Sequence, residues 1–144
     1  MKAATKAPLT APPKGTPGPY ASDQKFLEEQ RKLLHEERDT YQGQMLDLRA
    51  EAESLALERE PGDVQFDEES GEGGTVAVDR ERDLTLAAQA QATIAQIDIA
   101  LAAVEDKTYG LCENCHQPIP KARLRALPYV RLCMACKSGG LHRR

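Results

Sequence analysis

The stretch YGLCENCHQPIPKARLRALPYVRLCMACK, residues 109–137, contains all four cysteines of the chain. They form two C-x2-C pairs with seventeen residues between them, and the ligand candidates are Cys112, Cys115, Cys133 and Cys136. This spacing is typical of a four-cysteine zinc site, because each pair turns the backbone so that both thiolates face one tetrahedral ion. Four thiolates fill the coordination sphere and leave no position for a substrate. We therefore expect one structural Zn²⁺.

Other interpretations of the cysteines are weaker. A redox-active C-x2-C of the thioredoxin type needs a βαβ context that the sequence lacks, and an iron–sulfur cluster is a further alternative. His116 could replace a cysteine ligand, although an exposed turn residue is the simpler interpretation. The glycines at 71, 73 and 74 follow acidic residues and lack the downstream lysine of a phosphate-binding loop. With no nucleophile beside a base, we expect that the chain is not an enzyme.

Two helical patterns precede the cysteines. Ser22 can cap the first helix and Asp23 suits its first turn, and Pro61-Gly62 ends it. Its apolar positions recur every seven residues, at Leu27, Leu34, Tyr41, Leu48 and Leu55. The second pattern starts near Asp79 and has alternating three- and four-residue spacing, at Ala87, Ala90, Ile94, Ile97, Leu101 and Val104. That period is typical of a coiled coil.

The fold expected is mainly α. Residues 22–106 form a long antiparallel coiled-coil hairpin with an acidic tip loop at 61–78, because two helices of similar length are joined by a short Gly-rich segment. Residues 107–144 form a small four-cysteine zinc-finger domain with a basic C-terminal tail. Residues 1–21, which are rich in proline, form a disordered tail. An ordinary helix bundle is the alternative, but no third long helix is available to complete one.

Charge is strongly segregated. The formal net charge is −4, yet residues 61–78 carry −5 and residues 107–144 carry +7. A basic contact surface is expected in the zinc domain, made of Lys121, Arg123, Arg125, Arg131 and Lys137. Direct nucleic-acid binding through that surface is the alternative function, although the anionic hairpin would repel a duplex. A dimeric adaptor coiled coil is a third possibility. No apolar run is long enough to span a membrane and no signal peptide is recognisable, so we expect a cytoplasmic protein.

The zinc segment and the helix before it resemble the DksA/TraR family of bacterial transcription regulators. The resemblance is specific over about residues 79–137, and it depends on Glu105-Asp106, Tyr109-Gly110-x-Cys112-x-x-Cys115, Ile119-Pro120, Arg123-Leu124-x-Ala126-x-Pro128 and Cys133-x-x-Cys136-Lys137. It implies a protein that binds RNA polymerase and inserts its coiled coil into the secondary channel to modulate initiation. The residues that would act at the tip are Asp67, Glu68, Glu69 and Glu72.

The sequence departs from the family at two places. Well-known members carry D-x-x-D-x-A at the tip, where this chain has Glu69, Glu72 and Gly74, so charge is kept while the aspartates and the alanine are not. Members that respond to the alarmone ppGpp use basic residues where this chain has Gln96 and Leu127, with Lys137 retained. We therefore expect a weak or absent ppGpp response.

Overall fold

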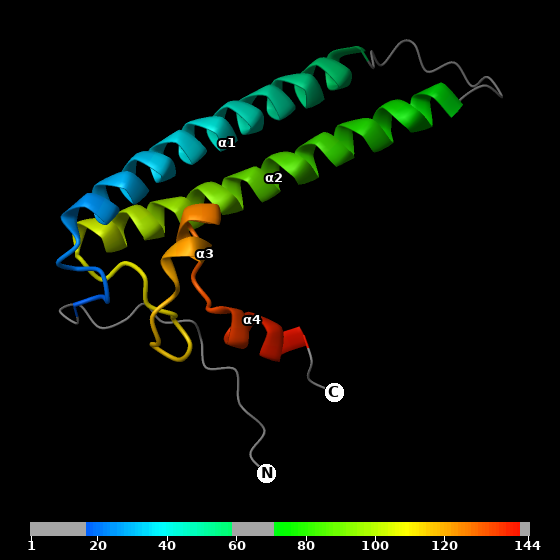
Figure 1. The fold of residues 1–144 in the computed structure, drawn as a ribbon. Helices are drawn as coiled ribbons and strands as arrows, with labels where there is room; N and C mark the ends of the chain where they lie inside the picture. Colours follow the sequence, from blue (N-terminus) through cyan, green and yellow to red (C-terminus); the bar gives the residue numbers. More distant parts are fainter. Residues whose placement is uncertain (1–16, 59–70, 142–144) are drawn as a thin grey trace. The chain divides into compact units, whose positions relative to one another are not determined.

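The computed structural model describes residues 17–58 and 71–141. Within these ranges the chain is mainly helical, and its one β-bridge is the isolated antiparallel contact between Leu111 and Pro118. The two long helices form a helical hairpin, and the four-cysteine segment follows them (Figure 1). This confirms the predicted fold class. The helices are α1 (Gln24–Glu58), α2 (Gly71–Glu105), α3 (Lys121–Ala126) and α4 (Met134–Leu141).

The chain divides into two compact units. The zinc unit contains the residues up to Glu36 and those from Gln96 onward, and the helical unit contains Glu37–Ala95. Both long helices therefore contribute to both units. In the part of the chain that the structure describes, no helix is long and apolar enough to cross a membrane.

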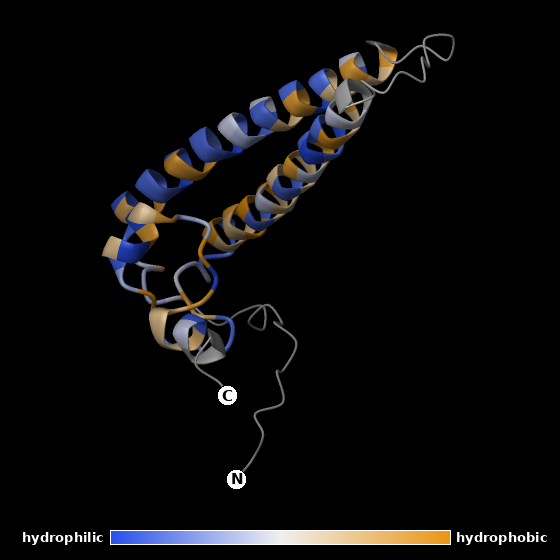
Figure 2. Cartoon of the chain, turned by 90° about the vertical axis from the view of Figure 1, so that its right-hand side faces the viewer, coloured by the Kyte–Doolittle hydropathy of each residue, from blue (hydrophilic) through white to orange (hydrophobic). Residues whose placement is uncertain are grey.

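In the helical unit, α1 and α2 pack along the predicted apolar seam. Met45 of α1 is buried against residues of α2, with Tyr41 and Leu48 packed beside it; the α2 residues are Ala87, Ala90 and Ile94. Arg49 adds a hydrogen bond of 2.8 Å to the Gln91 side chain. Hydrophilic residues alternate with apolar ones along both helices (Figure 2), as expected for helices with one buried stripe.

The zinc unit has its own core. Its most deeply buried apolar residues are Leu34, Ile97, Ile119 and Leu124, each at most 1% exposed. Near the end of α2 the buried stripe includes Ala100, while Leu101 is only partly buried. The predicted seam position is therefore displaced here. In this unit α2 is followed by the cysteine segment, which adds Tyr109 and Ile119 to the core and changes which α2 positions are covered.

The N-terminus of α1 differs from the prediction by one residue. The helix begins at Gln24, and Asp23 rather than Ser22 is its cap. The Asp23 Oδ1 accepts a hydrogen bond from the Phe26 backbone N–H at 3.1 Å, which is the bond an N-cap makes to the third helical residue. Ser22 lies one position too early to make it.

The second helix is longer than expected. It begins at Gly71, eight residues before the predicted start at Asp79, so residues 71–78 of the predicted tip loop are helical. Glycines at 71, 73 and 74 each cost a helix about 1 kcal/mol, but they do not forbid it when a long helix is already formed behind them. Asp67, Glu68 and Glu69 lie outside the described residues. Of Glu72 only the helical backbone is described.

Residues 17–21, which were predicted as part of the disordered tail, pack against the zinc unit. The Gly18 N–H donates to the Lys107 carbonyl at 2.8 Å, and the Tyr20 hydroxyl donates to the Ile119 carbonyl at 2.6 Å. The Tyr20 ring meets the Phe26 ring edge-on, with centroids 5.0 Å apart. A Cβ at Gly18 would lie 2.6 Å from the Tyr109 carbonyl oxygen, so this close approach requires glycine. The rest of the predicted tail, residues 1–16, lies outside the described residues.

Candidate metal centre

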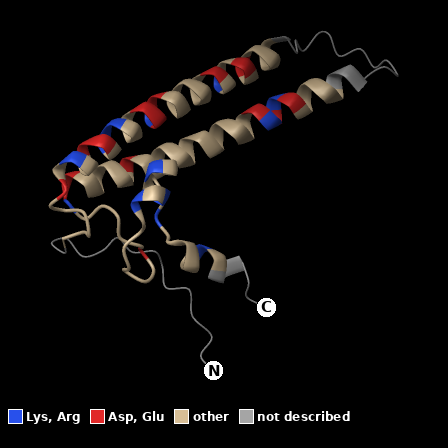
Figure 3. Cartoon of the chain, in the orientation of Figure 1, with Lys and Arg blue, Asp and Glu red and all other residues tan. Residues whose placement is uncertain are grey.

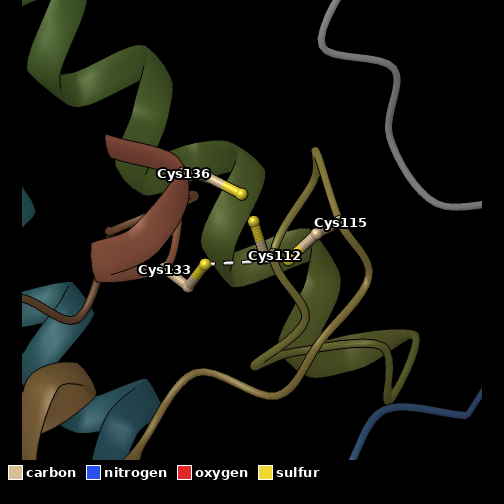
Figure 4. Close-up of side chains that lie close together, drawn as sticks. All are labelled: Cys112, Cys115, Cys133 and Cys136. Atoms are coloured by element: carbon tan, nitrogen blue, oxygen red, sulfur yellow. Dashed lines mark hydrogen bonds between the residues drawn. The ribbon is translucent and has the colours of Figure 1, made fainter. Parts of the chain in front are cut away.

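The four cysteines meet in the zinc unit. Cys112 and Cys115 lie in the segment between α2 and α3, Cys133 directly precedes α4, and Cys136 lies in the first turn of α4. All four Sγ atoms lie within 4.8 Å of one another, and those of Cys115 and Cys133 are 3.6 Å apart. Figure 4 shows the four sulfurs gathered around a common centre. The spacing motif therefore brings together the residues that it predicted.

The sulfur positions fit a tetrahedral zinc ion. Zinc–thiolate bonds of about 2.3 Å in a tetrahedron place neighbouring sulfurs roughly 3.8 Å apart. The 3.6 Å separation of Cys115 and Cys133 is close to that value, and the 4.8 Å limit for the full set requires only a small contraction. A bound zinc ion would link the two cysteine pairs and supply folding free energy to the unit, with no position left for catalysis.

Local backbone geometry explains how the first pair turns. The His116 N–H donates to the Cys112 carbonyl and the Cys112 N–H donates to the Gln117 carbonyl, each at 2.9 Å. Gly110 before the turn has φ +99°, which favours glycine, and His116 after it has φ +60°. His116 is exposed and is not among the clustered metal-binding side chains of the described residues. It is therefore the turn residue that the simpler interpretation predicted.

Without metal, the thiols do not share one ionisation behaviour. Burial opposes ionisation of Cys112, but hydrogen bonds with the backbone at Cys115, Cys133 and Asn114 lower its pKa to about 6. A hydrogen bond with the Gln117 backbone favours the Cys115 thiolate, yet burial and the neighbouring sulfurs together raise the pKa of Cys115 to about 12. Four adjacent thiolates need a cation to be stable together, and zinc deprotonates its thiol ligands outright. The donor set thus suits a divalent ion.

The predicted basic contact surface is largely occupied by contacts within the unit. Lys121 pairs with Asp23 at 2.5 Å, and Arg125 pairs with Glu29 at 2.9 Å. Figure 3 shows basic positions on α3 and acidic positions around the start of α1. Lys121 also holds the pKa of the Asp23 carboxyl below its usual value through its hydrogen bond.

The remaining cations of that surface differ in their contacts. The Arg123 side chain donates to the Leu132 carbonyl at 3.4 Å and contacts the Met134 sulfur at 2.9 Å. Arg131 forms an ion pair with Glu113. Lys137 in α4 is exposed. The five residues therefore do not form one free cationic patch.

Gln30 is a buried polar residue that the sequence motifs did not single out. Gln30 is 0% exposed, and its Nε2 donates to the Tyr109 hydroxyl at 2.9 Å and to the Leu124 carbonyl at 2.7 Å. The Tyr109 hydroxyl in turn donates to the Pro128 carbonyl at 2.7 Å. A signal was present: Gln30 lies three residues after Leu27 and four before Leu34, which places it on the apolar seam.

Comparison with known proteins agrees with this site. Residues 107–139 match the family described as the prokaryotic dksA/traR C4-type zinc finger. An uncharacterized protein of Aquifex aeolicus is 49% identical over 45 residues, and the match spans 31% of each chain. General stress protein 16O of Bacillus subtilis is 29% identical over 113 residues, which cover 74% of this chain and 69% of that one.

A solved structure is similar over most of the chain. The structure of transcription factor DksA2 from Pseudomonas aeruginosa matches with a TM-score of 0.68 and 25% identity, covering 88% of this chain and 91% of that one. The fold and site thus define a helical-hairpin protein with a C-terminal C4 zinc finger, and the expected single structural zinc is confirmed. The zinc finger of residues 107–139 is that of the dksA/traR type, and this match together with the similarity to DksA2 supports the family resemblance that the sequence predicted.

Proposed function

We propose that this protein is a cytoplasmic transcription regulator that binds RNA polymerase directly and performs no chemical catalysis itself. The hairpin enters the secondary channel, and the tip carboxylates Asp67, Glu68, Glu69 and Glu72 act there to modulate initiation. The observation that carries the proposal is the fold similarity to transcription factor DksA2 over 88% of the chain. The matching C4 zinc finger supports it independently, since that match depends on residues 107–139.

The physical properties of the hairpin suit a probe that enters a channel. The two long helices have 35 residues each, so each extends roughly 50 Å at 1.5 Å per residue. Their packing is apolar in the helical unit, with Met45 and Ile94 in one buried cluster. A cluster of carboxylates at the end of such an arm can interact with basic groups or with magnesium.

Direct nucleic-acid binding is less well supported. Phosphate binding needs cations that are free to pair with it. Lys121, Arg125 and Arg131 instead pair with carboxylates of the same unit. The zinc finger is therefore better suited to holding the start of α1 than to binding DNA.

A weak ppGpp response is also proposed. Leu127, which is 37% exposed, and Gln96 stand at two positions where responsive family members have basic residues. Neither side chain can supply a positive charge to a phosphate, and Lys137 alone gives a single cation. Tight ppGpp binding to the polymerase complex that is lost on Lys137→Ala would contradict this part of the proposal.

The decisive experiment is co-purification with the host's core RNA polymerase, followed by a transcription assay. A tip variant changes Asp67 to Asn and Glu68, Glu69 and Glu72 to Gln. A matched control removes the same charge from exposed helix positions, with Asp39→Asn, Glu51→Gln, Glu53→Gln and Glu81→Gln. We expect all three proteins to bind polymerase and only the tip variant to lose its effect on transcription. Failure of the wild type to bind at moderate salt would refute the proposed partner.

A further inference from the structure

Glu113 and Arg131 join the two cysteine pairs without the help of metal. The Arg131 Nε donates to Glu113 Oε1 at 2.7 Å, and the Arg131 Nη2 lies 2.6 Å from Glu113 Oε2. The Glu113 backbone N–H also donates to the Arg131 carbonyl at 3.0 Å. The two residues therefore contact each other through both backbone and side chains.

Burial distinguishes this ion pair from the others of the zinc unit. The Glu113 side chain is 6% exposed and that of Arg131 is 28% exposed. The 2.6 Å contact with Arg131 Nη2 is therefore what compensates the charge on the buried Glu113 Oε2. The Arg125–Glu29 pair, by contrast, is about half exposed on both sides. A buried carboxylate that loses its cation is strongly destabilised, whereas an exposed pair contributes little.

Glu113 and Arg131 each lie close in sequence to a cysteine ligand, so their contact brings the two cysteine pairs together. Glu113 directly follows the ligand Cys112, and Arg131 lies two residues before the ligand Cys133. Seventeen residues separate the two C-x2-C pairs, and holding such a loop closed costs conformational entropy. The contact between Glu113 and Arg131 joins the two ends of that loop, and it therefore places the cysteine pairs near each other before any ion is present.

A second contact acts in the same direction. The Asn114 Nδ2 donates to the Cys136 Sγ at 3.2 Å. Of the two residues between Cys112 and Cys115, Glu113 therefore contacts Arg131, just before the second cysteine pair, and Asn114 contacts a sulfur of that pair. Groups that orient metal ligands in this way commonly change metal affinity by about 10- to 100-fold when they are removed.

We propose that Glu113 and Arg131 are positioning residues that hold the two cysteine pairs together in the zinc-free protein and so set how tightly the site binds zinc. The inference rests on the zinc site alone and does not depend on RNA polymerase as the partner. Its experiments use purified protein and metal only, so its failure and the failure of the proposed function are distinguishable.

The first test measures zinc affinity of the full-length protein by competition with a chromogenic chelator. Glu113→Gln should weaken zinc binding by about 10- to 100-fold, because it removes the charge that Arg131 compensates. The matched control is Glu29→Gln, which breaks the exposed pair with Arg125 in the same unit, and it should change affinity less than about threefold. Equal affinities for wild type and Glu113→Gln would overturn the proposal.

The second test separates positioning from general stability. Binding of Co²⁺ reports ligand geometry through its visible absorption, and the rate of thiol modification reports cysteine exposure in the zinc-free protein. Glu113→Gln should alter the Co²⁺ spectrum and speed modification of the zinc-free thiols, while Glu29→Gln should change neither. If Glu113→Gln lowers zinc affinity but leaves both readouts as in wild type, the pair is only a stabilising contact and the proposal is wrong.

A charge-reversed pair covers the case in which the single variant does not fold. Glu113→Arg with Arg131→Glu restores opposite charges at the same two positions. Recovery of zinc affinity to within about tenfold of wild type supports the proposal, since it returns the site to the affinity range expected when orienting groups are present. A folded reversed pair that binds zinc no better than Glu113→Gln would contradict it.

Discussion

Among single residues, Gln30 makes the most direct connection between α1 and the segments around the cysteines. Its buried Nε2 donates hydrogen bonds to both the Tyr109 hydroxyl and the Leu124 carbonyl. Replacing it by alanine leaves the Leu124 carbonyl without that donor and opens space in the core. We expect Gln30→Ala to lower the free energy of unfolding by about 1–3 kcal/mol, as measured by urea denaturation of the zinc-loaded protein.

The control for this prediction is Gln44→Ala, at an exposed position of the same helix. An exposed glutamine replaced by the best helix former should change stability by less than about 0.5 kcal/mol. If the two variants unfold at the same urea concentration, the hydrogen bonds of Gln30 do not contribute as proposed.

Tyr109 is expected to make the free energy of unfolding depend on pH. Burial raises the pKa of its hydroxyl from 10.0 to about 12, with the Gln30 hydrogen bond acting in the opposite direction. Because the folded-state pKa lies above the unfolded one, the stabilising effect is fully present below pH 10 and is lost as the pH rises toward 12. A shift of this size corresponds to a loss on the order of 3 kcal/mol.

The measurement is the free energy of unfolding between pH 8 and about 12.5 for wild type and Tyr109→Phe. The variant starts from lower stability, because it loses the bond to the Pro128 carbonyl. Its slope above pH 10 should be shallower than that of wild type, since the raised phenol pKa is the cause of part of the wild-type slope. Parallel slopes would mean that the Tyr109 hydroxyl does not titrate as described.

At the scale of elements, the seam of α2 is tested by two isoleucines two residues apart. Ile97 is 0% exposed and Ile99 is 42% exposed, so the same substitution samples the buried and the open side of one helix. Ile97→Ala should cost about 2–4 kcal/mol through lost burial and the cavity it leaves. Ile99→Ala should cost less than about 1 kcal/mol, and thermal unfolding of both variants would show the difference.

The elements also show what the sequence could predict. The seam positions Ala87, Ala90 and Ile94 follow from spacing, because a period of about 3.5 residues repeats one helix face. The start of α2 at Gly71 could not be predicted from spacing. Glycine lowers local helix propensity, but adding residues to a long helix that is already formed costs less than starting a new one. Tyr20 was assigned to a disordered tail because the residues around it are rich in proline. Its order comes from a hydrogen bond to the Ile119 carbonyl, which is distant in sequence and cannot be seen in local composition.

Zinc removal acts on the elements of the zinc unit. The cysteines lie between α2 and α3 and around the start of α4, so a bound ion would link these two segments and stabilise the unit. Chelation should therefore lower the thermal midpoint clearly while leaving most of the helical circular-dichroism signal, because the helical unit has an apolar cluster that contains no ligand. Complete loss of helical signal on chelation would show that the helices depend on the metal.

Over the whole molecule, the cysteine motif predicted which residues meet at the metal centre, whereas charge counting did not reveal which carboxylates the basic residues pair with. The motif works because spacing within a short segment fixes which thiols can share an ion. The excess charge of residues 107–144 suggested a contact surface, but Lys121 and Arg125 find their carboxylates in residues almost a hundred positions earlier. Composition within one segment cannot reveal such pairing, because the partner belongs to another element.

This pairing leads to a prediction about nucleic acid. If Asp23 and Glu29 neutralise Lys121 and Arg125, then removing the two acids should release two cations to solvent. Asp23→Asn with Glu29→Gln should bind duplex DNA more tightly than wild type, with a slope of log affinity against log salt that is steeper by up to about two. The wild type should bind weakly, since its zinc unit offers few unpaired cations among the described residues.

A gel shift or fluorescence anisotropy titration at several salt concentrations measures both quantities. The control is Asp39→Asn with Glu51→Gln, which raises the net charge equally but at exposed positions of α1 in the helical unit. If that control strengthens binding as much as the first variant, net charge alone governs DNA binding. The ion pairs of Lys121 and Arg125 would then not limit it. If only the first variant gains affinity, the acids at the start of α1 keep the zinc finger from binding nucleic acid.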